Sequence, residues 1–261
     1  MTTALLRQTP WVIGNWKMNP AHLTQAVALA QACTQPVIDR VHLAVTPAVV
    51  HLAAVATVLN DQAVQLAAQD IAVAQGTGAY TGDVSGQLLA DVGVSWVLIG
   101  HSERRQHHAE SEQLLTQKIQ AALHAGLKIV LCVGEQLAER QAGQANAVVL
   151  AQLDAQLNYV APDLWQQSVM VAYEPVWAIG TGQTASPADA QAMHQAIRAH
   201  LRAHDSRLEQ TPILYGGSVK ADNAVSLAAC PDIDGALVGG AALNAESFLS
   251  IAEAFAQAKR A

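Results

Sequence analysis

A single carboxylate, Glu174, stands where an apolar run ends and an unusual loop begins. Residues 169–172 are apolar and indicate a buried strand, and the loop 175–182 starts with a proline and ends with glycines. Trp177 and Ile179 lie inside this loop, although they are too apolar for an ordinary solvated turn. A carboxylate at a strand end followed by an apolar flap is typical of an enzyme that closes over a reaction and excludes water from it. A buried loop whose tryptophan only packs is the alternative for this segment.

Two further apolar runs lead into side chains that could do chemistry. Residues 11–13 are followed by Asn15 and Lys17, and residues 96–99 by His101. An unpaired ammonium group is costly to bury. Lys17 therefore indicates either a site for a phosphate or a developing oxyanion, or a side chain that reaches the surface. We expect the His101 imidazole to point toward the same end of the sheet, and the other nine histidines are interpreted as surface residues.

Two glycine pairs provide a candidate anion site. One pair, at 216–217, precedes Ser218, and Gly239 and Gly240 form the other. Each pair follows an apolar run, and glycines in such positions let backbone N–H groups approach a phosphate. Either pair alone also suits a plain tight turn, but the two together favour a phosphate site.

Composition and charge argue against several classes of protein. The 261 residues carry a net charge of −7, which disfavours nucleic acid and anionic membrane surfaces as partners. No apolar run reaches the roughly 18 residues of a membrane span, and we expect no signal peptide. The three cysteines are odd in number and widely spaced, so neither a disulfide framework nor a metal motif is indicated. We therefore expect a cytoplasmic protein, in which Cys132 is a core thiol.

Eight short apolar runs recur along the chain and predict strands that are buried on both faces. They are residues 11–13, 43–45, 64–66, 96–99, 129–133, 169–171, 213–215 and 236–238. The stretches between them show helical spacing of apolar residues, which we interpret as core faces. Two such stripes are Ala190, Met193, Ile197, Leu201 and Phe248, Ile251, Ala252, Phe255. Ser186 followed by Pro187 predicts the start of a helix.

This alternation of strands and helices predicts right-handed βαβ units and a parallel sheet. Eight units in about 250 residues predict an α/β protein with one closed (β/α)8 barrel, a TIM barrel. No linker or change in composition marks a boundary, so residues 1–261 are expected to form a single barrel domain. An open doubly wound sheet is the alternative, but no Gly-x-Gly-x-x-Gly turn follows the first strand.

Six segments of the chain resemble signatures of the triosephosphate isomerase family. In the order in which they occur in that family, they are residues 14–19, 99–105, 131–135, 172–182, 215–219 and 238–241. Several of the segments are long, and they extend the resemblance over nearly the whole chain. The resemblance implies an enzyme of glycolysis and gluconeogenesis that interconverts dihydroxyacetone phosphate and D-glyceraldehyde 3-phosphate without a metal or organic cofactor.

The resemblance also implies a role for each candidate residue. Glu174 is similar to the family's general base, which moves a proton between adjacent carbons through an enediolate. His101 is similar to the electrophile, a neutral imidazole if a helix begins nearby. Lys17 and Asn15 resemble the residues that hold the substrate and polarise its oxygens. Four positions resemble the residues that grip the phosphate: Gly180, Ser218, Gly239 and Gly240.

The segment 76–83 resembles the long third loop of the family, which inserts into a partner subunit. The resemblance therefore implies a homodimer in which Thr81 lies near the partner's active site. Asp83 stands where the family more often has Glu, so an ion pair with Arg104 would be one methylene short.

Two other positions depart from the family pattern close to the phosphate glycines. Ala242 stands where Ser is common, which removes one hydroxyl near the phosphate. Asn244 replaces a common Lys at the start of the next helix. Neither departure removes a residue to which the resemblance assigns chemistry.

Two competing functions are weighed against the isomerase. A phosphate-binding barrel of the aldolase type would need a Schiff-base lysine on an inner strand, and of the five lysines only Lys17 and Lys128 are near strands. A catalytically silent barrel could act as an interaction protein. The presence of Glu174, His101 and Lys17 together argues against the silent barrel.

Overall fold

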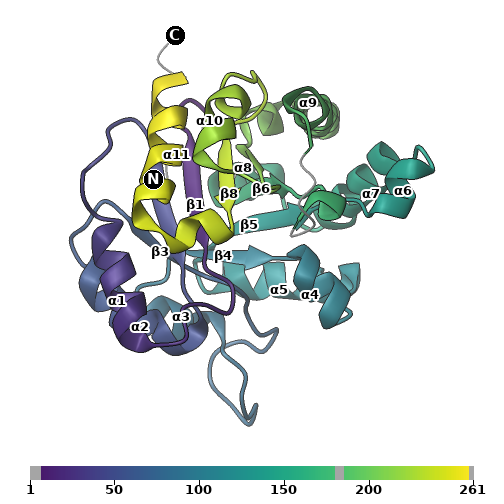
Figure 1. Cartoon of the computed structure of the whole chain (residues 1–261). Helices are drawn as coiled ribbons and strands as arrows, with labels where there is room; N and C mark the ends of the chain where they lie inside the picture. Colours follow the sequence, from purple (N-terminus) through teal and green to yellow (C-terminus); the bar gives the residue numbers. More distant parts are fainter. Residues whose placement is uncertain (1–6, 180–184, 259–261) are drawn as a thin grey trace.

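Eight parallel strands close into a barrel in a computed structural model, which describes residues 7–179 and 185–258. The strands follow one another around the barrel in chain order, and β8 pairs with β1 to close it (Figure 1). They are β1 (Trp11–Asn15), β2 (His42–Thr46), β3 (Gln65–Ala68), β4 (Trp96–Ile99), β5 (Lys128–Val133), β6 (Val169–Tyr173), β7 (Ile213–Tyr215) and β8 (Gly235–Val238). The predicted TIM barrel is confirmed, and the open sheet is wrong because a closed barrel has no edge strand.

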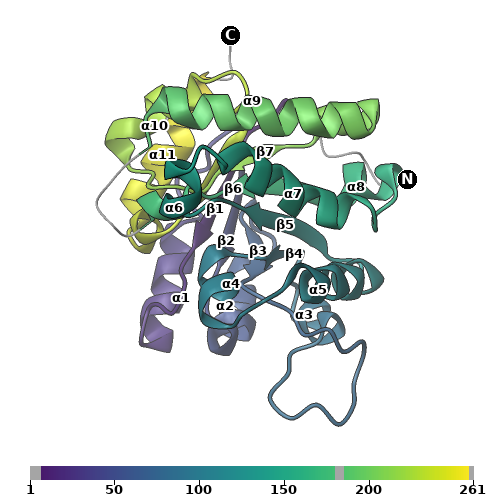
Figure 2. The ribbon, with the colours of Figure 1, turned by 90° about the vertical axis from the view of Figure 1, so that its right-hand side faces the viewer.

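Helices surround the barrel and cover the outer face of the strands (Figures 1 and 2). They are α1 (Leu23–Ala32), α2 (Leu52–Leu59), α3 (Gly86–Asp91), α4 (Ser102–His107), α5 (Glu112–His124), α6 (Leu137–Gln141), α7 (Ala145–Leu157), α8 (Pro162–Ser168), α9 (Pro187–His204), α10 (Ala221–Ala228) and α11 (Ala245–Ala258). Short 3₁₀ turns lie in the loops: η1 (Val49–His51), η2 (Val176–Ala178), η3 (Ser206–Gln210) and η4 (Gly240–Leu243). None of the helices in the described ranges is long and apolar enough to cross a membrane.

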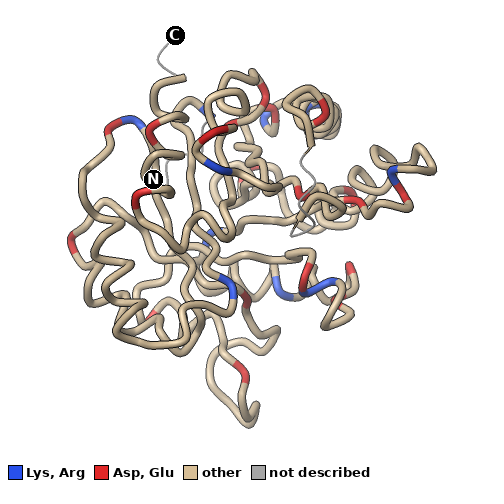
Figure 3. The backbone as a smooth tube through the Cα atoms, in the orientation of Figure 1, with Lys and Arg blue, Asp and Glu red and all other residues tan. Residues whose placement is uncertain are grey.

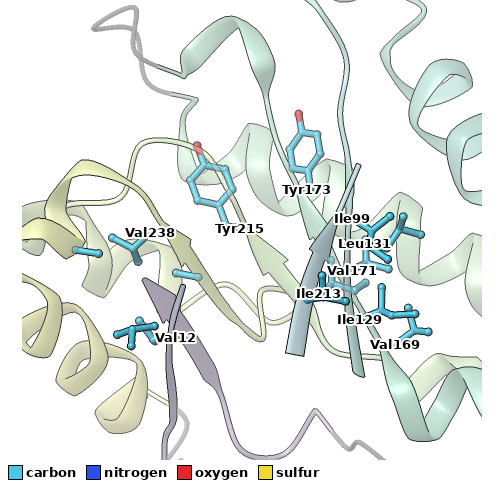
Figure 4. Packing of buried hydrophobic residues seen from close by; sticks show 14 of the residues in the cluster. Val12, Ile99, Ile129, Leu131, Val169, Val171, Tyr173, Ile213, Tyr215 and Val238 are labelled. Atoms are coloured by element: carbon cyan, nitrogen blue, oxygen red, sulfur yellow. The ribbon is translucent and has the colours of Figure 1, made fainter. Parts of the chain in front are cut away.

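Alternate residues of each strand enter two separate cores. Ile13 and Ala172 belong to the cluster that fills the barrel interior, whereas Val12 and Val171 next to them belong to the layer between strands and helices. Figure 4 shows part of that outer layer. Because side chains alternate along a strand, the residues two positions after Ile13 and Ala172 also point inward. Those residues are Asn15 and Glu174, so strand parity directs both side chains into the mouth of the barrel.

The predicted helix start and both apolar stripes are confirmed. Ser186 caps α9, where its hydroxyl accepts a hydrogen bond from the Asp189 N–H at 3.1 Å. All eight stripe residues of α9 and α11 are buried. The same stripe corrects one interpretation, because His194 follows Met193 on the buried face of α9 and is fully buried. His51 is also buried, so the surface interpretation is wrong for these two histidines.

Basic and acidic positions are interspersed along the helices and loops (Figure 3). A buried ion-pair network joins α9 to the segment that leads into β8. Arg198 donates to the Asp232 carboxylate at 2.7 Å and also pairs with Asp234, which is 1% exposed. Asp234 in turn accepts a hydrogen bond from the Ile213 N–H at 2.9 Å, so the network fixes α9 against two neighbouring strands. Arg7 also pairs with Asp234 at 3.1 Å, so removing Arg198 would leave the buried charges only partly compensated.

We expect Arg198→Met to lower the free energy of unfolding by about 3–5 kcal/mol, because two aspartates near the core lose their main cation. Denaturant unfolding followed by circular dichroism measures this change. Arg202→Met on the same helix is the matched control. Its guanidinium pairs with Glu209 at 3.5 Å with both side chains largely exposed, so it should cost under about 1 kcal/mol. Equal losses in the two variants would contradict the structural weight given to the buried network.

Candidate active site

A cavity of about 640 Å³ opens at the carboxyl ends of the strands. Its wall includes residues that follow β1, β4, β6, β7 and β8. The residues predicted from sequence that line it are Asn15, Lys17, His101, Glu174, Ser218, Gly239 and Gly240. Gly180, the remaining predicted residue, lies outside the described residues. The structure therefore brings together the side chains that the sequence placed at five separate strand ends.

Glu174 is 1% exposed and directly follows β6. Its backbone N–H donates to the Val133 carbonyl at 2.8 Å, which extends the β5–β6 ladder by one residue. One carboxylate oxygen accepts the Ser102 N–H at 2.9 Å, and the other lies 3.0 Å from Nε2 of His101. Burial raises the pKa of Glu174 above its ordinary value, although His101, the Ser102 N–H and Lys17 act to lower it. The result is a carboxylate that binds a proton more readily than an exposed glutamate does.

His101 is the N-cap residue of α4. Its Nδ1 accepts a hydrogen bond from the Glu103 N–H at 3.3 Å. An accepting Nδ1 carries no proton, so in the neutral ring the proton is assigned to Nε2, which faces Glu174. Gly100 precedes it with φ +77°. A side chain at this glycine would be strained in the left-handed region and would meet the Cys132 carbonyl at 3.1 Å.

Lys17 is held in an uncommon backbone conformation, with φ +53°. Its N–H donates to Oδ1 of Asn15 at 3.0 Å, and its carbonyl accepts a hydrogen bond from Gln69 at 2.7 Å. Its ammonium group pairs with Glu103 at 2.5 Å. Partial burial acts to raise the pKa of Glu103, but the hydrogen bond and charge of Lys17 hold it below its ordinary value. Sequence reasoning missed Glu103 and Gln69, although Glu103 stands only two residues after His101.

Both glycine pairs line the cavity and form its glycine wall. Gly239 is the N-cap of η4, and Gly240 begins that turn, so their backbone N–H groups lie at the positive end of a short helix. A Cβ on Gly239 would lie 3.6 Å from Cε of Lys17. Backbone donors and a lysine charge therefore converge on one end of the cavity, which suits an anion.

The departures near the glycines have structural explanations. Ala242 is fully buried and does not line the cavity, and the loss of a hydroxyl near the phosphate stays a prediction. Its Cβ lies only 3.0 Å from where a Cβ on Gly14 would be, which makes this a tightly packed position. Asn244 accepts a hydrogen bond from the Ser247 N–H at 2.8 Å and so caps α11, a role for which Asn is well suited.

Within the chain, Arg104 forms its ion pairs with residues other than Asp83. Its guanidinium contacts Asp70 and Glu110, both at 2.7 Å. Glu110 and Lys118 are buried and also form an ion pair. Arg104 therefore has two acidic partners without Asp83, whose side chain is one methylene shorter than that of Glu.

The described part of the flap is anchored to the barrel through its tryptophan. Nε1 of Trp177 donates to the Glu135 carboxylate at 2.8 Å, and Glu135 is fully buried. The guanidinium of Arg140 lies 4.7 Å from the centre of the Trp177 ring. Ile179, two residues later, lines the cavity. Glu135 ends the family-like segment 131–135, but sequence reasoning gave it no role, because its partner Trp177 lies 42 residues later in the chain.

Within residues 7–179 and 185–258, no group of three or more His, Cys, Asp or Glu side chains is arranged to hold a metal ion. Cys132 is buried in the barrel interior, and burial raises the pKa of its thiol well above the ordinary value. It is therefore a core thiol, as the sequence indicated.

Comparison with known proteins gives one consistent result. The profile of the triosephosphate isomerase family matches residues 10–255. A triosephosphate isomerase of Acinetobacter baumannii is 51% identical over 258 residues, which cover 96% of this chain and 98% of the relative. Those of Hahella chejuensis and Xanthomonas axonopodis pv. citri are each 46% identical, over 93% and 94% of this chain and 97% of each relative. The chain therefore belongs to the triosephosphate isomerase family of enzymes.

Proposed function

We propose that the chain interconverts dihydroxyacetone phosphate and D-glyceraldehyde 3-phosphate, with Glu174 as general base and His101 as electrophile. The observation that carries this proposal is the buried Glu174 carboxylate, which shares one cavity with His101 Nε2 and with Lys17. These are the three groups that proton transfer next to a carbonyl requires: a base, a hydrogen-bond donor and a positive charge.

The reaction moves one proton between neighbouring carbons, so a single base can serve both. Glu174 removes the proton from one carbon and returns it to the other. Meanwhile negative charge develops on the substrate oxygens. His101 hydrogen-bonds to these oxygens through Nε2: it gives a proton to the carbonyl oxygen and regains one from the neighbouring hydroxyl. Lys17 and Asn15 stabilise the negative charge. The Glu103 N–H supports this arrangement, because it keeps the proton of the neutral ring on Nε2.

The phosphate of the substrate binds at the glycine end of the cavity. The donors are the backbone N–H groups of Gly239 and Gly240. Ser218, which lines the same cavity, and Gly180 are proposed to contribute further donors. The flap 175–182 covers the site. The enediolate would otherwise expel phosphate by elimination, and an apolar cover keeps water out. Ile179 at the cavity wall and the anchored Trp177 support this role for the flap.

An aldolase reading has less support. Lys128 begins β5 and stands 5.3 Å from the centre of the Trp96 ring, at the end of the barrel away from the cavity. Of the two lysines near strands, Lys17 lines the cavity, and its ammonium group is paired with Glu103. Borohydride trapping with substrate would detect a Schiff base at either position.

We propose that two copies of the chain associate through the loop 76–83. This loop extends away from the barrel beside α3 (Figure 2), and Tyr80 in it is 59% exposed. Next to it, Met18 and Val49 line a second cavity together with the base of the loop, and both are exposed. Several exposed apolar side chains beside a projecting loop favour self-association. A cytoplasmic location and a single domain over residues 1–261 stay predictions.

Glu174→Gln should keep the fold but lose isomerisation, because the amide cannot accept the substrate proton. Removing a positioned base should lower kcat by at least about 10²–10⁴-fold, equivalent to about 3–5 kcal/mol. A coupled assay with glyceraldehyde 3-phosphate measures the rate, and the inhibition constant for inorganic phosphate is the control for an intact phosphate site. A variant within tenfold of the parent would remove Glu174 from the role of base.

The acid side of the pH profile should lie above that of an exposed glutamate. The base works as a carboxylate, so protonation stops the reaction, and burial raises the pKa of Glu174 above its ordinary value of 4.5. We therefore expect kcat/KM to fall as the pH drops through this raised pKa, while the fold persists by circular dichroism. Full activity down to a pH of 4.5 would show that burial does not destabilise the ionised carboxylate of Glu174.

Val49→Asp should shift the protein toward monomers and reduce activity, because it places a charge on the surface proposed to be covered. Val225→Asp on α10 is the matched control, since Val225 is 64% exposed and remote from the loop. Sedimentation velocity at micromolar concentration gives the mass of each. A parent protein that is a fully active monomer would refute both the contact and its link to catalysis.

A further inference from the structure

Gly134, the first residue after β5, lies directly against the backbone of Glu174. A Cβ built on Gly134 would be 1.8 Å from the Glu174 carbonyl oxygen and 3.2 Å from the Glu174 Cβ. Gly216, after β7, closes the other side, where a Cβ would be 3.0 Å from Cγ of Glu174. The base is thus packed between two backbones. Any displacement of Gly134 would therefore displace Glu174.

Gln152 of α7 holds both polar backbone groups of Gly134. Its Oε1 accepts the Gly134 N–H at 2.8 Å, and its Nε2 donates to the Gly134 carbonyl at 3.1 Å. The hydrogen bonds that link this segment to the β6 side come from the residues before and after Gly134. On the other side β4 ends at Ile99, opposite Leu131, so no strand reaches Gly134. The amide of Gln152 takes the place of the missing strand.

We infer that Gln152 is a positioning residue for Glu174, acting through Gly134. This inference rests on the proposed function. Gln152 does not line the substrate cavity. It lines a separate cavity of about 220 Å³, whose wall also includes Glu174. Its effect on the reaction must therefore pass through the position of the base. A displacement of about 1 Å at a reacting group can cost about a hundredfold in rate.

Gln156 provides a matched control on the same helix. It lies one turn after Gln152 and is fully buried. Its amide bonds Thr116 at 2.9 Å and the Glu112 carboxylate at 2.8 Å, so it joins α7 to α5 and does not touch Gly134. Its loss should affect stability without moving the base.

The test compares Gln152→Met, Gln152→Glu and Gln156→Met in the full-length protein. For each we would measure kcat, KM, the inhibition constant for inorganic phosphate, and the thermal midpoint. Gln152→Met keeps the length of the side chain but loses both hydrogen bonds, so kcat should fall about tenfold to a hundredfold. KM and the phosphate constant should stay within about threefold, because Lys17 and the glycine wall are unchanged. Gln156→Met should lower the thermal midpoint at least as much, with kcat within about twofold of the parent.

Gln152→Glu adds a pH signature that a purely structural role would not give. The carboxylate can accept the Gly134 N–H, but only the protonated acid can also donate to the Gly134 carbonyl. The ratio of its kcat to that of the parent should therefore rise as the pH falls. This variant also carries the test if Gln152→Met does not fold.

Three results would overturn the inference: parental kcat in both Gln152 variants, a loss of phosphate affinity in step with kcat, or an equal loss of kcat in Gln156→Met. The parent enzyme is assayed alongside. A parent that does not interconvert the two triose phosphates would overturn the proposed function and this inference together. An active parent with unaffected Gln152 variants would overturn this inference alone.

Discussion

The buried charge of Glu174 is the constraint on which the rest of the site depends. A carboxylate that is 1% exposed loses its hydration, and the protein must replace it with fixed donors. The Ser102 N–H and His101 Nε2 do so from the start of α4, while β5, β6 and β7 fix the backbone of Glu174. Burial outweighs these donors, because the pKa of Glu174 remains raised. The carboxylate is therefore held in place but incompletely compensated, which is the condition that favours a base over a structural ion.

Strand parity made the fold and much of the site predictable. The apolar runs gave all eight strands, and two-residue alternation is enough to direct Asn15 and Glu174 inward from Ile13 and Ala172. The glycine wall was predictable because backbone groups need no partner from elsewhere in the chain. What could not be predicted are contacts between elements far apart in sequence. Gln152 and Gly134 are 18 residues apart, and only the packing of α7 on the barrel brings them together.

His194 shows a different limit of prediction from sequence. His194 was predictable, because it follows Met193 within the same buried stripe of α9, but histidine was treated as polar and assigned to the surface. Its Nδ1 lies 3.2 Å from the Asp232 carbonyl, which makes burial of the ring acceptable. The helical periodicity of α9 therefore indicates that His194 is buried, whereas its residue type alone suggests the surface.

The position of Lys17 connects the site to the proposed contact between two copies. Lys17 and Met18 both line the cavity beside the loop 76–83, and Lys17 also lines the substrate cavity. Lys17 has a positive φ, which is costly for a residue with a side chain. Within one chain that conformation is held by Asn15 and Gln69, while Met18 next to it is 93% exposed. A second copy covering Met18 would fix the strained segment from its open side. Association would then act on the chemistry through the position of the lysine, and the active site of each copy would depend on the surface of the other.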